Sequence, residues 1–323
     1  MTIDQSVFIP VSPDVAFGLI TEPERLRRWQ TVAARVDLRV GGDYRWTITP
    51  GHSAAGTFTV VEPGKRIVFT WGWEGQDDST GSTVAITLEP VAGGTTVRLV
   101  HEGLSDESAV GHTEGWIHFL GRLEALATTG DAGADDWAAA PDPINELISA
   151  EATLAIVQRI LATLTEAHLP LPTPCDDFSV AELVEHLVGS ISGIGQALGA
   201  VLTDDAEASP EVRVANAAAP TLEAFAARGL EGTIDMGFAE LPATTVANIL
   251  NLEFLVHAWD FATATGQPLE VSPILSDYVL GLAQNTITPG MRGHSFADET
   301  LVEESAESLD RLVAFTGRQT ASA

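Results

Sequence analysis

The sequence predicts two structural parts: an α+β domain followed by an all-α four-helix bundle. Three observations support this division. Residues 1–128 contain short runs in which apolar and polar residues alternate, separated by Gly-rich breaks, and they end in a long amphipathic stretch. Residues 129–142 are small and acidic and end at prolines, which is typical of a linker. Over residues 143–323, apolar residues recur at the period of a helix, and no sheet is predicted.

The first part begins with a strand, two short helices and then a series of strands. Ser12 is a candidate N-cap and Pro13 suits the first helical turn, so a helix is predicted over 12–20, with a second over 22–29. The predicted strands, separated by Gly and Pro turn signals, are 2–9, 34–40, 43–49, 56–61, 66–73, 83–89 and 95–102. The last element is an amphipathic helix over 112–127. A curved antiparallel sheet that grips this helix is the simplest architecture.

Large aromatic residues are concentrated in the first part. The candidates to line a cavity between sheet and helix are Trp29, Trp46, Trp71, Trp73 and Trp116. Such a pocket would suit a hydrophobic small molecule, with polar groups supplied by Arg45, His52 or His118. The alternative is that the aromatic side chains only fill the core, and the sequence leaves both interpretations open. His101, His112 and His118 lack the spacing of metal ligands and are interpreted as edge or surface histidines.

Four motifs of the first part follow one another in a distinctive order. They are Pro10-Val-Ser-Pro-Asp-Val-Ala-Phe17, Gly41-Gly-Asp-Tyr44, Val61-Glu-Pro-Gly-Lys-Arg-Ile-Val-Phe-Thr-Trp71 and Gly115-Trp116. This order resembles the START-related SRPBCC superfamily, and most closely the branch named after the activator of the heat-shock-protein-90 ATPase. The resemblance covers nearly all of residues 3–128. It implies a START-like helix-grip fold, but it does not imply chaperone activation.

The second part is predicted to consist of helices. Their expected ranges are 143–166, 179–198, 211–216, 221–228, 248–263, 272–287 and 298–316. Ser179, followed three residues later by Glu182, has the form of a capping box, in which the two side chains satisfy backbone amides at the start of a helix. Four main helices with shorter extras are typical of a bundle.

One of these helices carries ionisable residues on an apolar background. Residues 248–262 contain no Gly or Pro and are apolar on almost all sides, so the helix is expected to be buried. Glu253 and His257 are four residues apart and Asp260 is three further on, so all three share one helical face. A buried carboxylate is costly unless it is paired, and a divalent metal ion is one such partner. The alternative is a hydrogen bond between Glu253 and His257 inside the bundle, with Asp260 facing water.

A second helix supplies another imidazole. His186 lies in the apolar stretch 183–188, and two helices of a bundle can turn such side chains towards one point. Two histidines and one glutamate form a zinc-type ligand set, with water in the remaining position. Glu182 lies four residues before His186, but di-iron bundles use Glu-x-x-His, and Glu182 is assigned to the helix cap. One metal ion is therefore favoured over two.

The second part also resembles a known family. The motifs that carry the resemblance are Thr173-Pro-Cys-Asp-Asp-Phe178, Val184-Glu-His-Leu-Val188 and Glu253-Phe-Leu-Val-His-Ala-Trp-Asp260. They resemble the DinB-like four-helix-bundle superfamily, specifically the metal-binding domain of mycothiol-dependent maleylpyruvate isomerase, over about 143–317. The resemblance implies that His186, Glu253 and His257 hold the metal, and it makes mycothiol a candidate thiol cofactor. No mycothiol-binding residue is identified, and Cys175 is interpreted as a packing cysteine.

The charge distribution excludes several classes of partner. The net charge is −29, and residues 131–323 contain 6 Lys and Arg against 29 Asp and Glu, whereas residues 1–130 contain 10 against 16. Such a surface repels phosphate backbones and anionic lipids, so neither a nucleic acid nor a membrane partner is expected. The single cysteine excludes an internal disulfide and fits the reducing cytoplasm. Neither a signal peptide nor an apolar stretch long enough to span a membrane is predicted.

Two hypotheses of function follow. In the first, the protein is a metal-dependent enzyme, with zinc expected, that transfers a thiol to or isomerises a small electrophilic or hydrophobic metabolite; Asp260 is the only nearby candidate for a general base. In the second, the protein is a non-enzymatic binder of hydrophobic small molecules or a stress-response protein, and its metal site is structural or vestigial. Three protein ligands plus water would favour the enzyme, and a fourth protein ligand the structural site. The sequence does not specify the oligomeric state, and a homo-oligomer is compatible with it.

Overall fold

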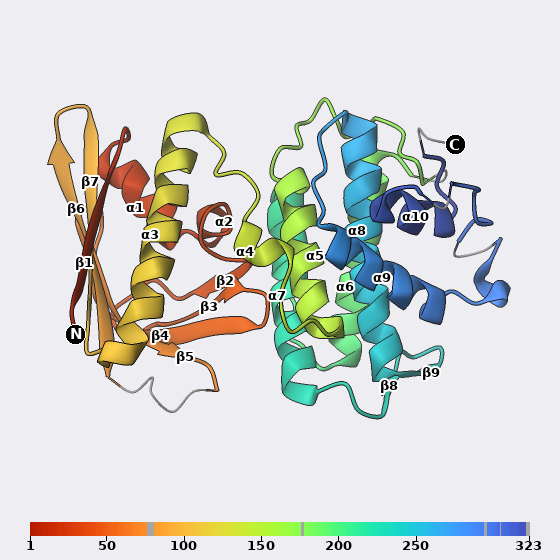
Figure 1. Ribbon diagram of the computed structural model, residues 1–323, viewed down its shortest axis with the longest axis horizontal. Helices are drawn as coiled ribbons and strands as arrows, with labels where there is room; N and C mark the ends of the chain where they lie inside the picture. The colour runs from red at the N-terminus through yellow and green to blue at the C-terminus, as the bar shows by residue number, and fades with distance from the viewer. Residues whose placement is uncertain (76–80, 176–177, 294–295, 304, 321–323) are drawn as a thin grey trace. The chain divides into compact units, whose positions relative to one another are not determined.

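The chain forms two compact units, Met1–Asp135 and Asp136–Ala323 (Figure 1). The first unit contains a seven-stranded antiparallel sheet with helices, and the second is mainly helical, so the predicted fold class is confirmed. The division lies inside the predicted linker 129–142, whose bounds stay a prediction. The computed structural model describes residues 1–75, 81–175, 178–293, 296–303 and 305–320.

The sheet of the first unit is antiparallel throughout and has the strand order β1-β7-β6-β5-β4-β3-β2. Its strands are β1 (Ile3–Ile9), β2 (Ala33–Val36), β3 (Asp43–Thr49), β4 (His52–Glu62), β5 (Arg66–Trp73), β6 (Ser82–Val91) and β7 (Gly94–Glu102). The helices α1 (Pro13–Thr21) and α2 (Pro23–Leu26) connect β1 to β2. Alternate residues of β6, such as Val84 and Ile86, are buried, as the period of two requires.

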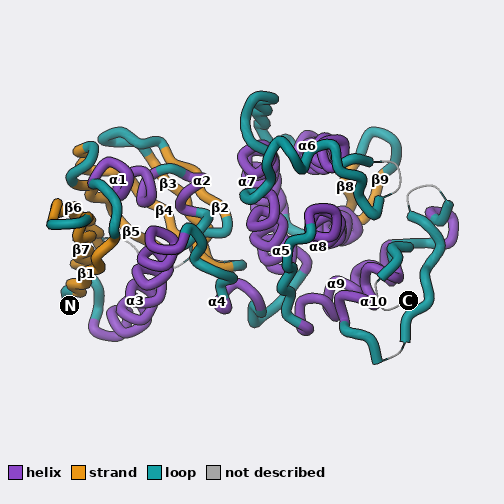
Figure 2. Tube along the Cα trace, turned by 90° about the horizontal axis from the view of Figure 1, so that it is seen from above, coloured by secondary structure: helices purple, strands orange, loops and turns teal. Residues whose placement is uncertain are grey.

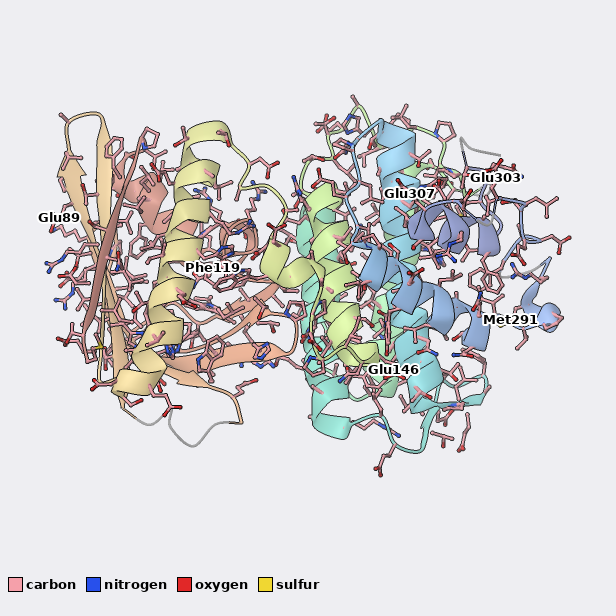
Figure 3. The ribbon with its side chains drawn as sticks, viewed as in Figure 1. Glu89, Phe119, Glu146, Met291, Glu303 and Glu307 are labelled. Atoms are coloured by element: carbon pink, nitrogen blue, oxygen red, sulfur yellow. The ribbon has the colours of Figure 1, made fainter. Side chains whose placement is uncertain are left out.

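The helix α3 (Asp106–Thr129) packs its apolar side against this sheet (Figure 1). Its buried residues recur at helical spacing and include Trp116, Phe119, Leu120, Leu123 and Leu126; Phe119 is labelled in Figure 3. The helix begins before the predicted residue 112 because the Ser105 hydroxyl accepts the backbone N–H of Ser108. It ends at Gly130, whose φ of 86° is a left-handed conformation that glycine adopts readily.

Four helices of the second unit form the predicted bundle. α5 packs against α7 and α8, and α6 also packs against α7 and α8, so the four helices lie side by side (Figure 1, Figure 2). The helices of this unit are α4 (Asp136–Ala139), α5 (Glu146–Leu161), α6 (Val180–Ala197), α7 (Pro210–Arg228), α8 (Ala243–Thr265), α9 (Pro273–Thr286) and α10 (Ser308–Phe315), with a 3-10 helix at Pro289–Met291. None of the described helices combines the length and apolar character that a membrane crossing requires.

Two features of the second unit differ from the prediction. The unit contains a small hairpin of β8 (Thr233–Asp235) and β9 (Glu240–Pro242), although the sequence predicts no sheet here. Its strands are too short for an alternating pattern to be recognised. The helices predicted at 211–216 and 221–228 form the single helix α7, with Pro220 in its interior. A proline normally interrupts a helix because it lacks an N–H, but here the helix continues past Pro220, and the next two residues, Thr221 and Leu222, are buried.

The last predicted helix is also shorter than expected. α10 starts at Ser308 rather than 298, and Glu304 lies outside the described residues. The backbone N–H of Thr300 donates to the carbonyl oxygen of Ala314, 3.0 Å away. Residues before α10 therefore bond to its far end instead of forming a helix of their own.

Candidate metal centre

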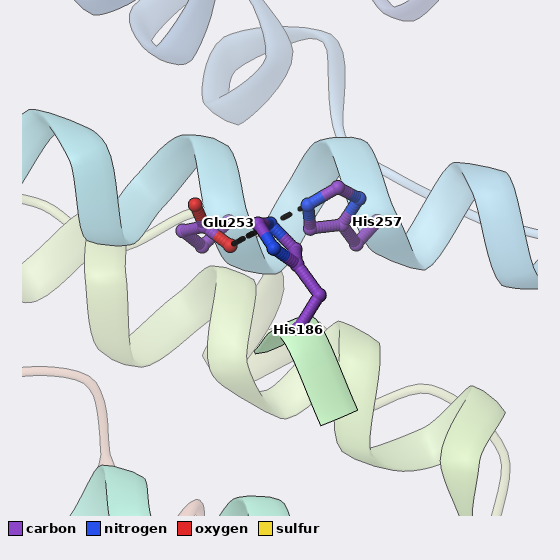
Figure 4. Close-up of side chains that lie close together, drawn as sticks. All are labelled: His186, Glu253 and His257. Atoms are coloured by element: carbon purple, nitrogen blue, oxygen red, sulfur yellow. Dashed lines mark ion pairs between the residues drawn. The ribbon is translucent and has the colours of Figure 1, made fainter. Parts of the chain in front are cut away.

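Three side chains from two helices of the second unit converge. His186 comes from α6, and Glu253 and His257 come from α8 (Figure 4). The Nε2 atoms of both histidines lie 3.4 Å from the same oxygen, Oε2 of Glu253. One ligand atom from each residue lies within 4.8 Å of the other two. The structure thus brings together the three side chains that the sequence predicts as metal ligands.

Local sequence explains why these side chains meet. Glu253 and His257 are one helical turn apart on α8, so they lie above one another on the same face. The start of α6 is held by the predicted capping box: the Ser179 hydroxyl accepts the N–H of Glu182, and the Glu182 carboxylate accepts the N–H of Ser179. Glu182 is therefore engaged at the helix end, as the one-metal interpretation requires.

The chemistry of these donors fits a divalent cation. Oε2 of Glu253 is buried and has no hydrogen-bond partner among the described residues, because both imidazole nitrogens stand farther away than a normal hydrogen bond. A buried carboxylate oxygen that makes no hydrogen bond of normal length is costly, and a cation between it and the two imidazoles would satisfy it. The His186 side chain is 35% exposed whereas that of His257 is 9% exposed, so the cluster is accessible from the His186 side.

The charges of the cluster depend on one another. Burial alone would raise the pKa of Glu253, but the two neighbouring imidazoles lower this pKa to about 2. Burial alone would lower the pKa of His257, but the carboxylates of Asp260 and Glu253 raise this pKa to about 9. The cluster therefore favours a negative carboxylate beside a positive partner.

The other face of His257 meets a buried ion pair. Nδ1 of His257 lies 2.9 Å from Oδ2 of Asp260, and the Arg318 guanidinium donates to both Asp260 oxygens, at 3.2 and 2.8 Å. Asp260 is fully buried, so it does not face water. Burial alone would raise the pKa of Asp260, but His257 and Arg318 lower it. An engaged carboxylate of this kind is poorly suited to act as a general base, the role for which the sequence offered Asp260 as its only candidate.

No pattern in the sequence predicts that Arg318 pairs with Asp260. It follows α10 and is separated from Asp260 by 58 positions, so neither helical spacing nor a motif connects the two. A buried acidic residue predicts that some cation is nearby, but not which one.

The Thr173–Phe178 motif contributes a ring contact. Phe178 stacks on the His186 imidazole, with ring centroids 5.1 Å apart and an interplanar angle of 26°. The turn before it is closed by Thr173, whose hydroxyl donates to the carbonyl oxygen of Phe178 and accepts the N–H of Cys175. Cys175 is half-buried in this turn, and Asp176 and Asp177 lie outside the described residues.

In the first unit, four of the five predicted tryptophans, all but Trp73, are buried in the packed core, and Trp73 packs against it. Trp29 and Trp46 belong to the packed core, where the Trp29 indole donates to the carbonyl oxygen of Leu19. Trp71 and Trp73 both donate their indole N–H to Nε2 of His112, each at 3.2 Å. Trp116 is also buried in the core, beside Trp71, with ring centroids 5.2 Å apart.

The interpretation of His101 as an edge or surface residue is wrong. His101 is 0% exposed, and its Nδ1 accepts the indole N–H of Trp116 at 3.1 Å. Its Nε2 is buried without a hydrogen-bond partner among the described residues. Burial, together with the neighbouring His112, lowers the pKa of His101 to about 3, so the ring is neutral.

An open pocket of about 300 Å³ borders part of this aromatic cluster. Its lining residues are Ala55, Thr70, Trp71, Gly72, Trp73, Glu74 and Gly75. These residues come from β4, β5 and the turn after β5 and not from α3, so this pocket does not lie between sheet and helix as predicted, and two of the five predicted pocket tryptophans border it. Of the predicted polar groups, Arg45 reaches this lining by its ion pair with Glu74, His52 lies beside Trp73, and His118 pairs with Asp135.

Two families match separate parts of the chain. Residues 10–128 match the activator of Hsp90 ATPase homolog 1-like protein family. Residues 150–262 match the mycothiol maleylpyruvate isomerase N-terminal domain. The chain is a fusion of these two families. This identification confirms both resemblances in the sequence, and the isomerase-type domain contains the entire cluster of His186, Glu253 and His257.

Individual relatives cover one part of the fusion each. Two Mycobacterium tuberculosis proteins of unassigned function, MT0763 and Rv0738, are 32% identical over 163 residues, which is 49% of this chain and 90% of each relative. Among solved structures, protein MLL2253 from Mesorhizobium loti is 25% identical with a TM-score of 0.38, over 41% of this chain and 99% of that one. DynU16, from the dynemicin biosynthetic locus, is 25% identical with a TM-score of 0.39 over 42% of this chain, which spans half the length of DynU16.

The isomerase-type match ends before the residue that pairs with Asp260. It stops at residue 262, whereas Arg318 lies after α10. The buried ion pair therefore joins a residue inside the matched domain to one outside it.

Proposed function

We propose that the isomerase-type domain binds one divalent metal ion, zinc, through His186, Glu253 and His257, and catalyses thiol transfer to, or isomerisation of, a small electrophilic metabolite. The observation that carries this proposal is the buried Glu253 oxygen, without a hydrogen-bond partner among the described residues, that faces the Nε2 atoms of two histidines. Three protein ligands leave one position open, which is typical of catalytic rather than structural zinc sites.

Each of these residues would have a separate task. Glu253 would supply the negative charge that attracts the cation. His257 would be oriented by the contact of its Nδ1 atom with Asp260. His186, with its ring against Phe178, would close the set on the accessible side, where a substrate can approach. The bound ion would acidify a thiol or water at the open position, so that a nucleophile is available near neutral pH.

Mycothiol is the thiol that we propose as co-substrate, on the basis of the family that residues 150–262 match. A thiol-dependent reaction requires a reducing compartment, and a chain with one cysteine fits the cytoplasm. The excess of acidic residues after residue 130 favours a small-molecule substrate over a nucleic acid or an anionic membrane.

The Hsp90-activator-type domain supports a second function, the binding of a hydrophobic small molecule. The open pocket bordered by Trp71 and Trp73 supports this proposal, because aromatic side chains are common in the lining of small-molecule sites. If this domain alone carries the function, the metal centre is structural or vestigial. Binding should then quench tryptophan fluorescence and should not depend on metal.

Metal analysis of the purified full-length chain, combined with a thiol-transfer screen, tests the enzymatic proposal. We expect about one zinc ion per chain, because the cluster offers one set of three donors. His257→Ala should remove that zinc and any mycothiol-dependent turnover while the first domain stays folded. His168→Ala is the matched control, because His168 lies in the same domain and its ring accepts the backbone N–H of Thr165 in a turn outside the cluster.

The outcomes separate the two functions. Zinc in the wild-type protein that persists in His257→Ala would show that the site is elsewhere. Zinc that is lost in His257→Ala, without turnover of any electrophile tested with mycothiol, would favour the binding function.

A further inference from the structure

Asp260 and Arg318 form a buried ion pair in the second unit. Asp260 has no exposed surface, and the Arg318 side chain is 9% exposed. The guanidinium Nε and Nη2 donate separately to Oδ1 and Oδ2, so the carboxylate plane is set by two contacts. A buried charge without a partner is strongly unfavourable, so each of these residues depends on the other for its position.

This pair determines which nitrogen of His257 can accept a metal ion. An ionised carboxylate only accepts hydrogen bonds, so Nδ1 of His257 must carry the proton that points to Asp260. When a shared cation displaces the second proton of the ring, Nε2 presents its lone pair towards Glu253 and His186, which is the direction that cation needs. A carboxylate behind a ligating histidine is a general means of fixing both tautomer and ring orientation.

The position of Arg318 is set by the segment on either side of α10. Its backbone N–H donates to Val313, and its carbonyl oxygen accepts the Thr300 hydroxyl. Gly317, just before it, has a φ of 92°, and a Cβ at this position would lie 2.6 Å from the side chain of Ala297. Only glycine allows the chain to turn so close to Ala297 and deliver the guanidinium to Asp260.

We propose that Arg318 is a positioning residue of the metal centre, which acts through Asp260 on His257, and that the described residues that place it, 297–300 and 308–318, belong functionally to the isomerase-type domain. This inference rests on the proposed metal function. It differs from that function because it concerns a residue outside the three ligands and outside the matched range 150–262.

Zinc affinity of the full-length protein, measured by competition with a chromophoric chelator, tests the proposal. Arg318→Gln should weaken zinc binding by about 10- to 100-fold, the usual effect of removing a group that orients a metal ligand. Arg318→Lys keeps the charge but not the two-point contact, so it should recover part of the affinity. Asp260→Asn should also weaken binding, because an amide can present its NH₂ group to Nδ1 and favour the wrong tautomer.

The matched control is Arg311→Gln. Arg311 lies on α10 and pairs with Asp277 through Nη2 at 2.6 Å, so this variant also breaks an arginine–aspartate pair of the C-terminal segment. It should lower stability slightly and leave zinc affinity unchanged.

Nitrogen-15 NMR of the zinc-loaded protein distinguishes a positioning role from a structural one. The Nδ1–H signal of His257 should weaken or exchange faster only in the Arg318 and Asp260 variants.

Three results would overturn the proposal. The ion pair would have only a structural role if folded Arg318→Gln kept the wild-type zinc affinity and an unchanged His257 signal. If Arg318→Gln does not fold, the same result in Arg318→Lys would have this meaning. An equal loss of affinity in Arg311→Gln would attribute the effect to general destabilisation. A wild-type chain that binds no zinc would overturn both this proposal and the proposed function.

Discussion

His101 in the first unit and His257 in the second are both buried, but the groups around them differ in kind. His101 is surrounded by Trp71, Trp116 and the imidazole of His112, and the pKa of His101 is lowered to about 3. His257 lies between two carboxylates, and its pKa is raised to about 9. Burial acts in the same direction on both rings, so the neighbours decide the sign of the shift.

The comparison shows which of the two clusters requires a cation. The aromatic cluster is neutral, because its donors are indoles and its acceptors are imidazole nitrogens. The second cluster contains the carboxylates of Glu253 and Asp260, and Arg318 balances only one of them. A proton on His257 can supply the missing charge, and a divalent ion can replace it. Three predictions test this difference between the units.

The largest expected effect is that zinc stabilises the second unit alone. Binding to the folded state adds about 2.7 kcal/mol to the free energy of unfolding when free zinc is 100 times its dissociation constant. For a unit of this size, in which 1 kcal/mol shifts the melting temperature by about 2–4 °C, that corresponds to a rise of about 5–11 °C. Calorimetry of the full-length chain should show one transition that moves with zinc and returns on addition of a chelator.

The control for this experiment lies in the first unit. Five of the seven tryptophans are there, so their fluorescence reports mainly on its unfolding. Their transition should stay in place when zinc is added, and His257→Ala should show no shift in either unit. An equal shift of both transitions would contradict the comparison.

The next effect is a pH dependence that belongs to the first unit. Above pH 6.5 the His101 ring is neutral in the folded and the unfolded chain. Below that value the unfolded chain takes up a proton that the folded chain does not, until the pH approaches the folded pKa of about 3. The free energy of unfolding should therefore fall with falling pH by up to about 1.4 kcal/mol per pH unit in this window.

Urea unfolding followed by tryptophan fluorescence, between about pH 7 and pH 5, measures this slope. His101→Gln keeps an acceptor for the Trp116 indole but cannot take up a proton, so it should flatten the dependence. His168→Gln, in the second unit, should leave the slope as in the wild type. A slope that survives in His101→Gln would assign the titration to another group.

The smallest effect concerns the helix starts of the two units. Ser179 caps α6, which carries His186, and Ser105 caps α3. Ser179→Ala and Ser105→Ala should each lower the free energy of unfolding by about 1 kcal/mol, because each leaves a backbone N–H without its acceptor. Each variant should move only the calorimetric transition of its own unit; a shift in the other unit would show that the two unfold together.

Much of the candidate site could be predicted because its residues are close in sequence. Glu253 and His257 share a face of α8 through their spacing, and the capping box marks the start of α6. His186 was assigned with the help of a family resemblance, because periodicity alone does not say which face of one helix meets which face of another. The assignment of these three residues as metal ligands stays a prediction.

The features that were not predicted depend on contacts between distant segments. Thr300, which was predicted to be helical, bonds to Ala314 near the end of α10, and the buried His101 accepts a hydrogen bond from Trp116 of another element. Pro220 remains inside α7 although the local rule ends a helix there. Local patterns identify the helices and strands, whereas packing between them decides their ends and the surroundings of each polar side chain.

The distance along the chain between Asp260 and Arg318 has a consequence for synthesis. Translation proceeds from the N-terminus at about 5–20 residues per second, so roughly 3 to 12 seconds separate the two residues. During this interval His186, Glu253 and His257 have all been made, but Asp260 still lacks its counter-charge. The helices that carry the three candidate ligands are therefore made before Arg318. The free-energy cost of burying the Asp260 carboxylate falls only after Arg318 has been made and can pair with it.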